Sequence, residues 1–571
     1  YQDVDASNDN QEAIEVLQAV GIMSGIDNQG NFGPDGSITR NEMAVVMAHL
    51  LNLDYDYYRG VNTFSDVPEW AAPYVAACVA EGVTAGVGNG LYGGDQKITA
   101  AQAGLMVMKA LGYFQYQEDF GSDWQVATIR QASYINLFDK VNSDAESALT
   151  RGQVAQLVLN GLKSNMVTFT GDVGTTATIG DATIHIGYRA EYTSKTGSEK
   201  KYNSLVSGTT DIAGNNQYYI QLGEELYNGK LTEKADSDAF GRPATTWRYD
   251  YNVIGTYVND PDLTYTSSVK EGDIYADLGL SKDKTSDEFY IDGKEQKSAV
   301  TLSKKDDTKL TGSANGVLTE VWYDEWIDNN NVTHTNLIVT EINTYVGQVN
   351  AVTEASSSHD RYITLSKANV APASLNTKFE TEKFAKNDLV TYTAAWNESA
   401  SRYDIQQVEN LAMSATGVLT EWNGTSANIS NADKASANNN FTVDGKTYKY
   451  SKNAYVVDEN GFGSDSDISA FDVDKSELNV YLDKYGYAIY VSGVEGETNY
   501  AAVIGFGETN QYGSETRGAT LLLPDGTQKE VIAKLSGSLK WADFSTKTYG
   551  TDSKNLVTDG VADLVNDSVG D

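Results

Sequence analysis

Apolar residues recur at helical spacing in three similar stretches within the first 163 residues. In the first stretch they stand at positions i, i+3, i+4 and i+7, which places them along one side of a helix. These residues are Met43, Val46, Met47 and Leu50. Thr39 precedes them and Glu42 follows it by three residues, so each side chain can accept a backbone N–H at the helix start. The pattern predicts a capped amphipathic helix.

The same layout returns twice further along the chain. Thr99 with Gln102, and Thr150 with Gln153, repeat the capping pair, and an apolar stripe follows each. A longer helical pattern lies upstream of every pair. We therefore predict three repeats, each a helix, a loop and a capped second helix. Their expected bounds are 1–55, 61–113 and 119–163. Because one such unit cannot bury its own apolar stripe, the three are expected to pack into a single helical module.

The residue after each capping threonine is not explained by the cap. It is Arg40 in repeat 1, Ala100 in repeat 2 and Arg151 in repeat 3. An arginine in the first turn of a helix is slightly disfavoured by the helix dipole and adds nothing to the capping box. We expect Arg40 to be exposed, and both arginines to serve a purpose other than helix formation.

From about residue 166 the spacing changes from helical to alternating. Segments 182–192 and 477–493 alternate apolar and polar residues, which is typical of strands. Asp-Gly pairs at 292–293, 444–445 and 525–526 stand between β-forming residues and indicate tight hairpins. The sequence GVLTE begins at Gly316 and again at Gly417, so we predict a degenerate repeat of about 100 residues. The expected β-rich domains are sandwich-like or small barrels at 166–312, 313–415, 416–500 and 501–571, and the last could be truncated.

Several motifs of the helical repeats resemble those of a known family. YQDV and FSDV, followed by WAAPYV, GIMSG and NFGPDGSITRNE, are similar to the S-layer homology (SLH) domains by which bacterial surface proteins attach to cell-wall polysaccharide. The resemblance implies a multidomain, extracellular protein of the cell wall and S-layer. Its first part would be an all-α, pseudo-threefold module with grooves between repeats, and all-β domains would follow. Residues 238–257 resemble, more weakly, a segment of clostridial-type S-layer proteins.

The resemblance also implies which residues bind the polysaccharide. In the family, a basic residue of a TRAE-like motif, an aspartate and a tryptophan bind an anionic sugar that is often pyruvylated. The matching residues are Arg40, Arg151, Asp3, Asp66, Asp123, Trp70 and Trp124. The chemistry suits the task, because a guanidinium binds a carboxylate through two hydrogen bonds, an indole packs on a sugar ring and a carboxylate accepts hydroxyl hydrogen bonds.

Two arrangements of these residues are open. If each groove is shared between successive repeats, Arg40 joins Asp66 and Trp70 in one complete site. If each groove lies within one repeat, only repeat 3 has its aspartate, tryptophan and arginine together. Ala100 and Asp9 stand where the pattern expects an arginine and a tryptophan.

Composition narrows the partners. The 571 residues carry 42 Lys and Arg against 79 Asp and Glu, a net charge of −37, and no basic segment stands out. Nucleic acid and anionic membrane surfaces are therefore not expected partners. No apolar run is long enough to span a bilayer, and the single cysteine, Cys78, is expected in the core. The chain opens inside the first repeat's motif, so we expect a secreted protein without its targeting segment, and the chain could be a fragment.

No catalytic motif stands out in the β-rich region, so we expect no enzyme and no required cofactor. Two functions remain. One is a structural surface-layer subunit whose identical copies form a two-dimensional lattice; the other is a wall-anchored enzyme or adhesin that displays a glycan-active β-module. Calcium (Ca2+) is the metal to consider, because a short acidic segment offers the oxygen ligands that this ion prefers. Its carboxylates are Asp465, Asp467, Asp472 and Asp474.

Overall fold

The computed structural model describes most of the chain. The described residues are 1–4, 8–179, 182–197, 208–210, 215–297, 302–304, 308–328, 330–423, 439–494, 502–509, 516–522 and 526–532. The chain divides into two compact units, of which the first holds residues 1–344, 372–379 and 392–408 and the second holds 345–371, 380–391 and 409–571. Most of the expected domain at 501–571 lies outside the described residues, and so does Asp525 of the third Asp-Gly pair.

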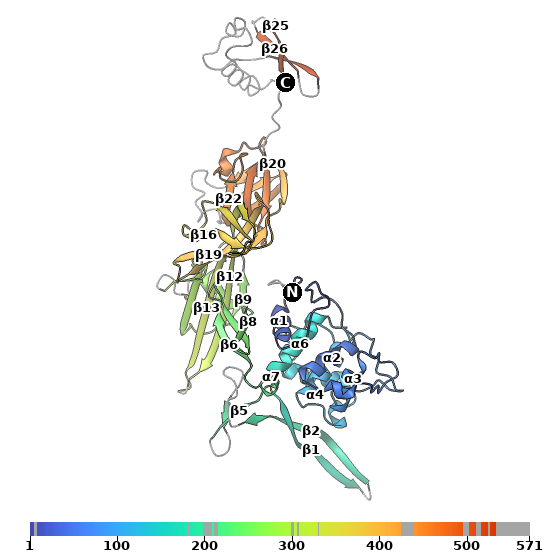
Figure 1. Cartoon of the computed structure of the whole chain (residues 1–571). Coiled ribbons are helices and arrows are strands. Elements are labelled where there is room, and N and C mark those ends of the chain that lie inside the picture. The colour runs from blue at the N-terminus through green and yellow to red at the C-terminus, as the bar shows by residue number, and fades with distance from the viewer. Residues whose placement is uncertain are drawn as a thin grey trace. The chain divides into compact units, whose positions relative to one another are not determined.

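The first 163 residues form helices in three successive pairs (Figure 1). The helices are α1 (Gln11–Ala19), α2 (Arg40–Leu50), α3 (Ala72–Ala80), α4 (Ala100–Ala110), α5 (Trp124–Tyr134) and α6 (Arg151–Lys163), with short 3-10 helices η1 (Tyr55–Tyr58) and η2 (Gln117–Phe120). The capping boxes predicted at Thr39, Thr99 and Thr150 are all present. The predicted layout of helix, loop and capped helix is confirmed. Within the described residues, every helix is too short or too polar to cross a membrane.

Three short segments before the capped helices join the repeats around one axis. The backbone N–H of Ile38 donates to the carbonyl of Leu149 (3.4 Å), Leu149 donates to Ile98 (3.0 Å), and Ile98 donates to Ile38 (2.9 Å). Because this ring of hydrogen bonds closes on itself, each repeat stands in the same relation to the next. The pseudo-threefold helical module is confirmed.

The three repeats share one apolar core. Met47, Val107 and Leu157, one from each second helix, are fully buried in it. Cys78 is buried as predicted, and its thiol donates to the carbonyl of Ala44 at 3.3 Å. Burial raises the pKa of this thiol to about 12, so Cys78 remains protonated and serves as a packing residue.

The core of the helical module continues beyond residue 163. A three-stranded sheet in the order β6-β7-β8 packs on it, and Trp247 of that sheet is buried in the same core. The strands are β6 (Leu231–Ser237), β7 (Pro243–Tyr249) and β8 (Asn252–Val258). The Trp247 indole donates to Glu12 (2.7 Å) and the Tyr257 hydroxyl donates to Glu15 (2.5 Å), both on α1. The segment 238–257 therefore ties a β-sheet to the first helix.

Three further sheets lie in the first unit. A two-stranded ribbon pairs β1 with β2, a small sheet has the order β3-β5-β4, and a larger one has the order β11-β10-β13-β12-β9. The elements are β1 (Val167–Ile179), β2 (Ala182–Ser194), β3 (Thr196–Gly197), β4 (Gly208–Thr210), β5 (Asn216–Tyr219), α7 (Leu222–Tyr227), β9 (Leu263–Tyr265), α8 (Glu271–Asp277), β10 (Ser286–Ile291), β11 (Lys294–Glu295), β12 (Val317–Ile327) and β13 (Thr333–Asn343). Since β9 and β10 pair with β12 and β13, one sheet joins residues on both sides of the expected boundary between 312 and 313.

The second unit contains a closed barrel with the strand order β20-β21-β22-β24-β23. Leu419, Phe441 and Val480 are fully buried in its core, which confirms a small barrel in the β-rich region. The strands from 345 onward are β14 (Tyr345–Thr353), β15 (Tyr362–Lys367), β16 (Leu375–Asn376), β17 (Lys378–Glu380), β18 (Leu389–Asn397), β19 (Arg402–Asn410), β20 (Ala415–Asn423), β21 (Asn440–Val443), β22 (Lys446–Val457), β23 (Glu477–Leu482), β24 (Ala488–Gly493), β25 (Ala502–Thr509), β26 (Thr516–Leu522) and β27 (Gln528–Ile532), and η3 spans Ile468–Ala470.

Two predicted Asp-Gly hairpins are confirmed. The pairs at 292–293 and 444–445 connect β10 to β11 and β21 to β22, and all four residues have positive φ, as a type I′ turn requires.

The two GVLTE segments lie in different structural contexts. One begins β12 in an open sheet and follows its Asp-Gly pair, whereas the other lies in β20 of the barrel and precedes its pair. The structure therefore does not show the predicted repeat.

Candidate functional site

Arg40 of repeat 1 reaches into the loop of repeat 2. Its Nε donates to the carbonyl of Tyr92 (3.3 Å) and its Nη2 donates to the carbonyl of Ala85 (3.0 Å). The guanidinium carbon lies 4.6 Å from the centre of the Tyr92 ring, close enough for a cation–π contact. Among the described residues, Nη1 has no hydrogen-bond partner. Arg40 is thus held against an aromatic ring by bonds from Nε and Nη2.

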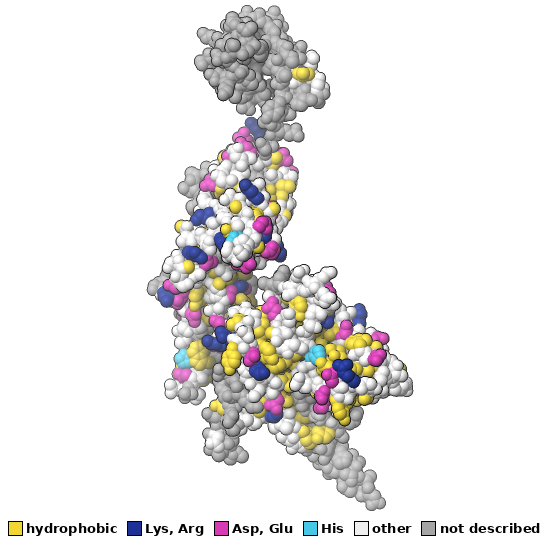
Figure 2. All heavy atoms as spheres, in the orientation of Figure 1, with side chains coloured by type: hydrophobic (Ala, Val, Ile, Leu, Met, Phe, Trp, Pro, Cys, Tyr) yellow, Lys and Arg dark blue, Asp and Glu magenta, His cyan; other side chains and the backbone are white. Residues whose placement is uncertain are grey.

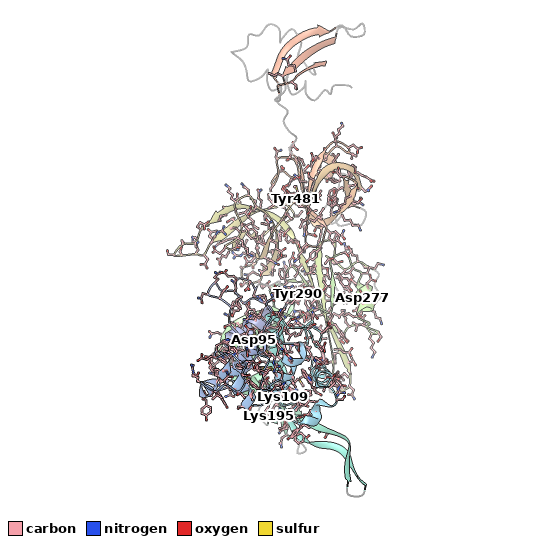
Figure 3. All side chains as sticks on the ribbon, turned by 90° about the vertical axis from the view of Figure 1, so that its right-hand side faces the viewer. Asp95, Lys109, Lys195, Asp277, Tyr290 and Tyr481 are labelled. Atoms are coloured by element: carbon pink, nitrogen blue, oxygen red, sulfur yellow. The ribbon has the colours of Figure 1, made fainter. Side chains whose placement is uncertain are left out.

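The expectation that Arg40 is exposed is wrong. The residue is only 7% exposed, because the loop of repeat 2 covers the first turn of α2. The backbone N–H groups of Arg40 and Asn41 donate to the carbonyls of Gln96 and Gly94, each at 2.9 Å. The Asn41 amide also donates to Asp95, which Figure 3 labels, at 3.2 Å. Repeat 2 therefore satisfies donors that the start of a helix otherwise leaves unpaired.

Asp66 holds the same loop from within repeat 2. Its two carboxylate oxygens accept the backbone N–H groups of Tyr92 and Gly93, each at 2.8 Å. The hydrogen bond from Tyr92, followed by that from Gly93, lowers the pKa of Asp66. Asp66 and Arg40 thus meet around one residue, Tyr92. Residues of successive repeats therefore come together here, as the shared arrangement requires.

The junction between repeats 3 and 1 has the same geometry. Arg151 donates from Nε to the carbonyl of Phe32 (2.9 Å) and from Nη2 to the carbonyl of Ser24 (2.7 Å). Its guanidinium carbon lies 4.7 Å from the centre of the Phe32 ring. Asp3 accepts the backbone N–H groups of Phe32 and Gly33, each at 2.7 Å. Arginine, aromatic ring and aspartate therefore recur as a set.

The junction between repeats 2 and 3 keeps the backbone contacts and lacks this set. Ala100 and Ala101 donate to the carbonyls of Ser147 (3.1 Å) and Ala145 (2.9 Å), as Arg40 and its neighbour do in the first junction. Counting back from these equivalent bonds places Ser143 where repeat 2 has Tyr92. Both the arginine and its aromatic partner are absent here.

An apolar contact takes their place. A Cβ on Gly104 of α4 would lie 2.7 Å from Cζ of Phe138, so the Phe138 ring packs directly against the helix backbone. Asp123 also differs from Asp3 and Asp66, because it caps α5 by accepting the N–H groups of residues 125 (2.9 Å) and 126 (3.3 Å). Among the described residues, this junction therefore has neither an arginine on an aromatic ring nor an aspartate that binds the backbone of the loop.

The candidate tryptophans are partly exposed. Trp70, four residues after Asp66, is 55% exposed, and Trp124 is 36% exposed. Hydrophobic side chains gather over the helical region on the face shown in Figure 2. Among the described residues, the junctions at Arg40 and Arg151 have an arginine and a loop-binding aspartate, and Asp66 is the one of these two aspartates that a tryptophan follows four residues later in the sequence. The arrangement within a single repeat is not the one observed, since Arg151 contacts repeat 1 while Asp123 caps a helix of repeat 3.

Sequence reasoning missed the two rings that lie beneath the arginines. Phe32 and Tyr92 each precede a glycine in the loop, in NFGP and LYGG, and the third loop lacks such a pair. An aromatic residue that is present only opposite an arginine was the available signal. Without knowledge of which repeat follows which around the axis, that signal could not be assigned to a contact.

Three of the four aspartates considered for calcium have separate local partners. Asp465 accepts from the Tyr455 hydroxyl and from Asn369, and Asp467 caps the short helix η3. Asp472 lies 4.0 Å from Lys475. Across the part of the chain that the structure describes, no group of three or more His, Cys, Asp or Glu side chains is placed to hold a metal ion. A calcium site at these carboxylates stays a prediction.

A model of the S-layer homology domain matches residues 1–44 and 63–103. The helical module contains SLH domains. The matched residues cover most of repeats 1 and 2 and include Arg40 and Asp66, whereas repeat 3 carries the same structural elements outside the match. The junction described around Tyr92 is thus the contact between the two matched SLH domains.

Relatives with similar sequences are proteins of the bacterial cell surface. The chain is 28% identical over 163 residues to a middle cell wall protein of Brevibacillus brevis, covering 28% of this chain and 15% of that protein. It is 27% identical over 199 residues to a cell surface protein of Thermoanaerobacter kivui, covering 34% and 25%. It is 32% identical over 107 residues to the S-layer protein sap of Bacillus anthracis, covering 19% and 13%. The chain thus spans a quarter or less of the length of these relatives.

Proposed function

We propose that this chain is a structural subunit of a bacterial surface layer, held at the cell wall non-covalently by an anionic polysaccharide that its SLH domains bind. The carrying observation is the junction between repeats 1 and 2, where Arg40 and Asp66 both contact Tyr92. Trp70 follows Asp66 by four residues and is exposed. The names of the relatives support the cell surface as the location.

The chemistry of this junction suits a negatively charged sugar such as a pyruvylated one. Within the described residues, Nη1 of Arg40 has no partner and could donate to a carboxylate, and the cation is held in place by two carbonyls and a ring before any ligand arrives. Such preorganisation lowers the entropic cost of binding. It matters because the chain carries a net charge of −37, whose overall field repels an anionic polymer. Trp70 supplies an exposed indole face for the sugar ring.

The test is co-sedimentation of the full chain with purified cell walls, before and after the secondary polysaccharide is extracted. Trp70→Ala is the informative variant, since its side chain is 55% exposed and its loss should not disturb the core. We expect it to weaken wall binding about tenfold, or ~1.4 kcal/mol. Tyr134→Ala, which removes an aromatic ring that is 77% exposed on α5, is the matched control and should bind normally.

Two outcomes would contradict the proposal. Equal binding to extracted and intact walls would show that the polysaccharide is not the ligand. Equal binding of the Trp70→Ala and wild-type chains, with Tyr134→Ala also unchanged, would remove this groove from the binding surface.

Lattice formation is the second half of the proposed function. Chains with a net charge of −37 repel one another, and divalent cations that bridge carboxylates of neighbouring copies would relieve this repulsion. We therefore expect self-association of the purified chain to increase with calcium. Electron microscopy and light scattering at high protein concentration are the measurements, and a chain that stays monomeric at every calcium concentration would contradict this expectation.

A further inference from the structure

Among the strands that the structure describes, the ribbon formed by β1 and β2 has no neighbour along either edge. Its strands are each 13 residues long and pair antiparallel from Val167 with Ser194 out to Ile179 with Ala182. The register is irregular between Phe169 and Gly171 and between Val173 and Thr175. In the described part of the chain they form a two-stranded sheet by themselves, which Figure 1 shows as a pair of long arrows. A two-stranded ribbon of this kind is marginally stable in water when nothing covers it.

The base of the ribbon is fixed to the helical module. Phe169 of β1 lies 4.3 Å from Tyr116, measured between ring centres, and Tyr192 of β2 lies 5.5 Å from Tyr113. The Tyr192 hydroxyl donates to Asp119 (2.5 Å) in the same connection between repeats 2 and 3. The ribbon is therefore held at a defined position on the module.

The outer part of β1 carries neither the charges nor the proline by which proteins commonly protect an exposed edge. Edge strands in monomeric proteins carry lysines, other charges or proline, which prevent pairing with a second chain. Residues 173–179 of β1, VGTTATI, hold no charge and no proline, although charged residues make up 21% of the sequence. By contrast, the edge strand β6 has Glu233, Lys234 and Asp236 within seven residues.

We propose that the β1 edges of two copies of this chain pair antiparallel, so that two ribbons join into one four-stranded sheet across a twofold axis. A second copy is the fitting partner because the regular stretch from Thr175 to Ile179, rotated by half a turn, presents donors opposite the acceptors of an identical stretch. The proposal rests on the proposed function, since it names a contact between lattice subunits.

Cysteine scanning tests this pairing directly. The chain has one native cysteine, and Cys78 is buried with a pKa raised to about 12, so it will not compete in cross-linking. Single cysteines at Thr175, Thr176 and Thr178 should give disulfide-linked dimers under mild oxidation. The yield should be highest at the position nearest the twofold axis and fall on either side. Ser237→Cys on β6 is the matched control and should give at least tenfold less dimer.

Lysine variants test whether the contact drives assembly. The double variant Thr176→Lys with Thr178→Lys should abolish self-association, whereas Ala235→Lys with Ser237→Lys on exposed β6 positions should leave it intact. Both variants should bind cell walls like the wild type, because neither touches the SLH junctions. A wild-type chain that fails to bind walls would instead refute the proposed function.

The pairing proposal is overturned if dimer yields at the three ribbon positions equal that of Ser237→Cys. It is also overturned if the ribbon cysteines cross-link only to other proteins of the cell envelope, or if the lysine variant assembles normally.

Discussion

The junction between repeats 1 and 2 and the junction between repeats 2 and 3 share their backbone contacts but differ in the side chains that pack there. Both use the same backbone hydrogen bonds from the start of a capped helix to the next loop. In one, the residue after the cap is Arg40, which lies on Tyr92; in the other it is Ala100, and Phe138 packs against Gly104 instead. Packing therefore does not need the arginine. A buried cation on an aromatic ring is a feature added to a junction that could close without it.

The largest expected effect comes from Arg40→Ala. The variant leaves the carbonyls of Tyr92 and Ala85 without their donor and removes the cation from the ring. We expect the free energy of unfolding of the first unit to fall by about 2–4 kcal/mol, measured by urea denaturation with circular dichroism. An unchanged midpoint would show that this junction is as independent of its guanidinium as the junction at Ala100.

The apolar junction should respond instead to added volume. Gly104→Val places two methyl groups where the Phe138 ring lies, and should lower the free energy of unfolding by about 1–3 kcal/mol. Phe138→Ala in the same chain should recover part of this loss by making room. If Phe138→Ala lowers the free energy of unfolding further, residues 104 and 138 are not in the contact described.

The two junctions should also differ in how much each contributes to cell-wall binding. Trp124→Ala removes an indole next to a junction without arginine, and we expect less than a twofold change in binding, against the roughly tenfold change for Trp70→Ala. Equal losses for the two variants would mean that the groove between repeats 2 and 3 also binds, and that Arg40 does not decide which groove is used.

The smallest expected effect is a loss of stability of the loop at 83–98 at low pH. Because backbone donors lower the pKa of Asp66, its carboxylate stabilises the loop above the ordinary pKa of 3.8, and this contribution is lost as the pH falls through the lower pKa of the folded state. We expect pepsin to cut the loop at 83–98 only below that range. Asp66→Asn should weaken the loop already at neutral pH, whereas Asp123→Asn should leave it unchanged. Cleavage of the wild type at the same rate from pH 3 to 6 would contradict this reading.

Much of the helical module could be read from the sequence because its signals are short-range. Thr39, Thr99 and Thr150 each cap a helix with a partner three residues away, so the spacing in the sequence is the geometry of the contact. The Asp-Gly hairpins at 292–293 and 444–445 were predictable for the same reason, since two adjacent residues adopt the positive φ that the turn needs.

The domain boundaries within the β-rich region were harder to predict, because a sheet can pair strands that lie far apart in the sequence. β10 pairs in parallel with β13, and β9 pairs with β12. The local sequence of a strand does not show which other strand it will pair with. The docking of Trp247 on α1 is similar, since its partner Glu12 stands 235 residues earlier. The sequence around Trp247 showed no sign of this contact, and only packing placed the residue in the core of the helical module.

The sequence by itself determined which residues are chemically able to act, and the tertiary structure decided which of them meet. Arg40, Arg151, Asp66 and Asp123 were all candidates on residue type and motif. Arg40 contacts a loop 52 residues away and Arg151 contacts one 119 residues away, whereas Asp123 bonds only to its own helix. The physical reason is that a cap or a turn is fixed by bonds within one segment, while a junction depends on how three separately folded segments close around a common axis.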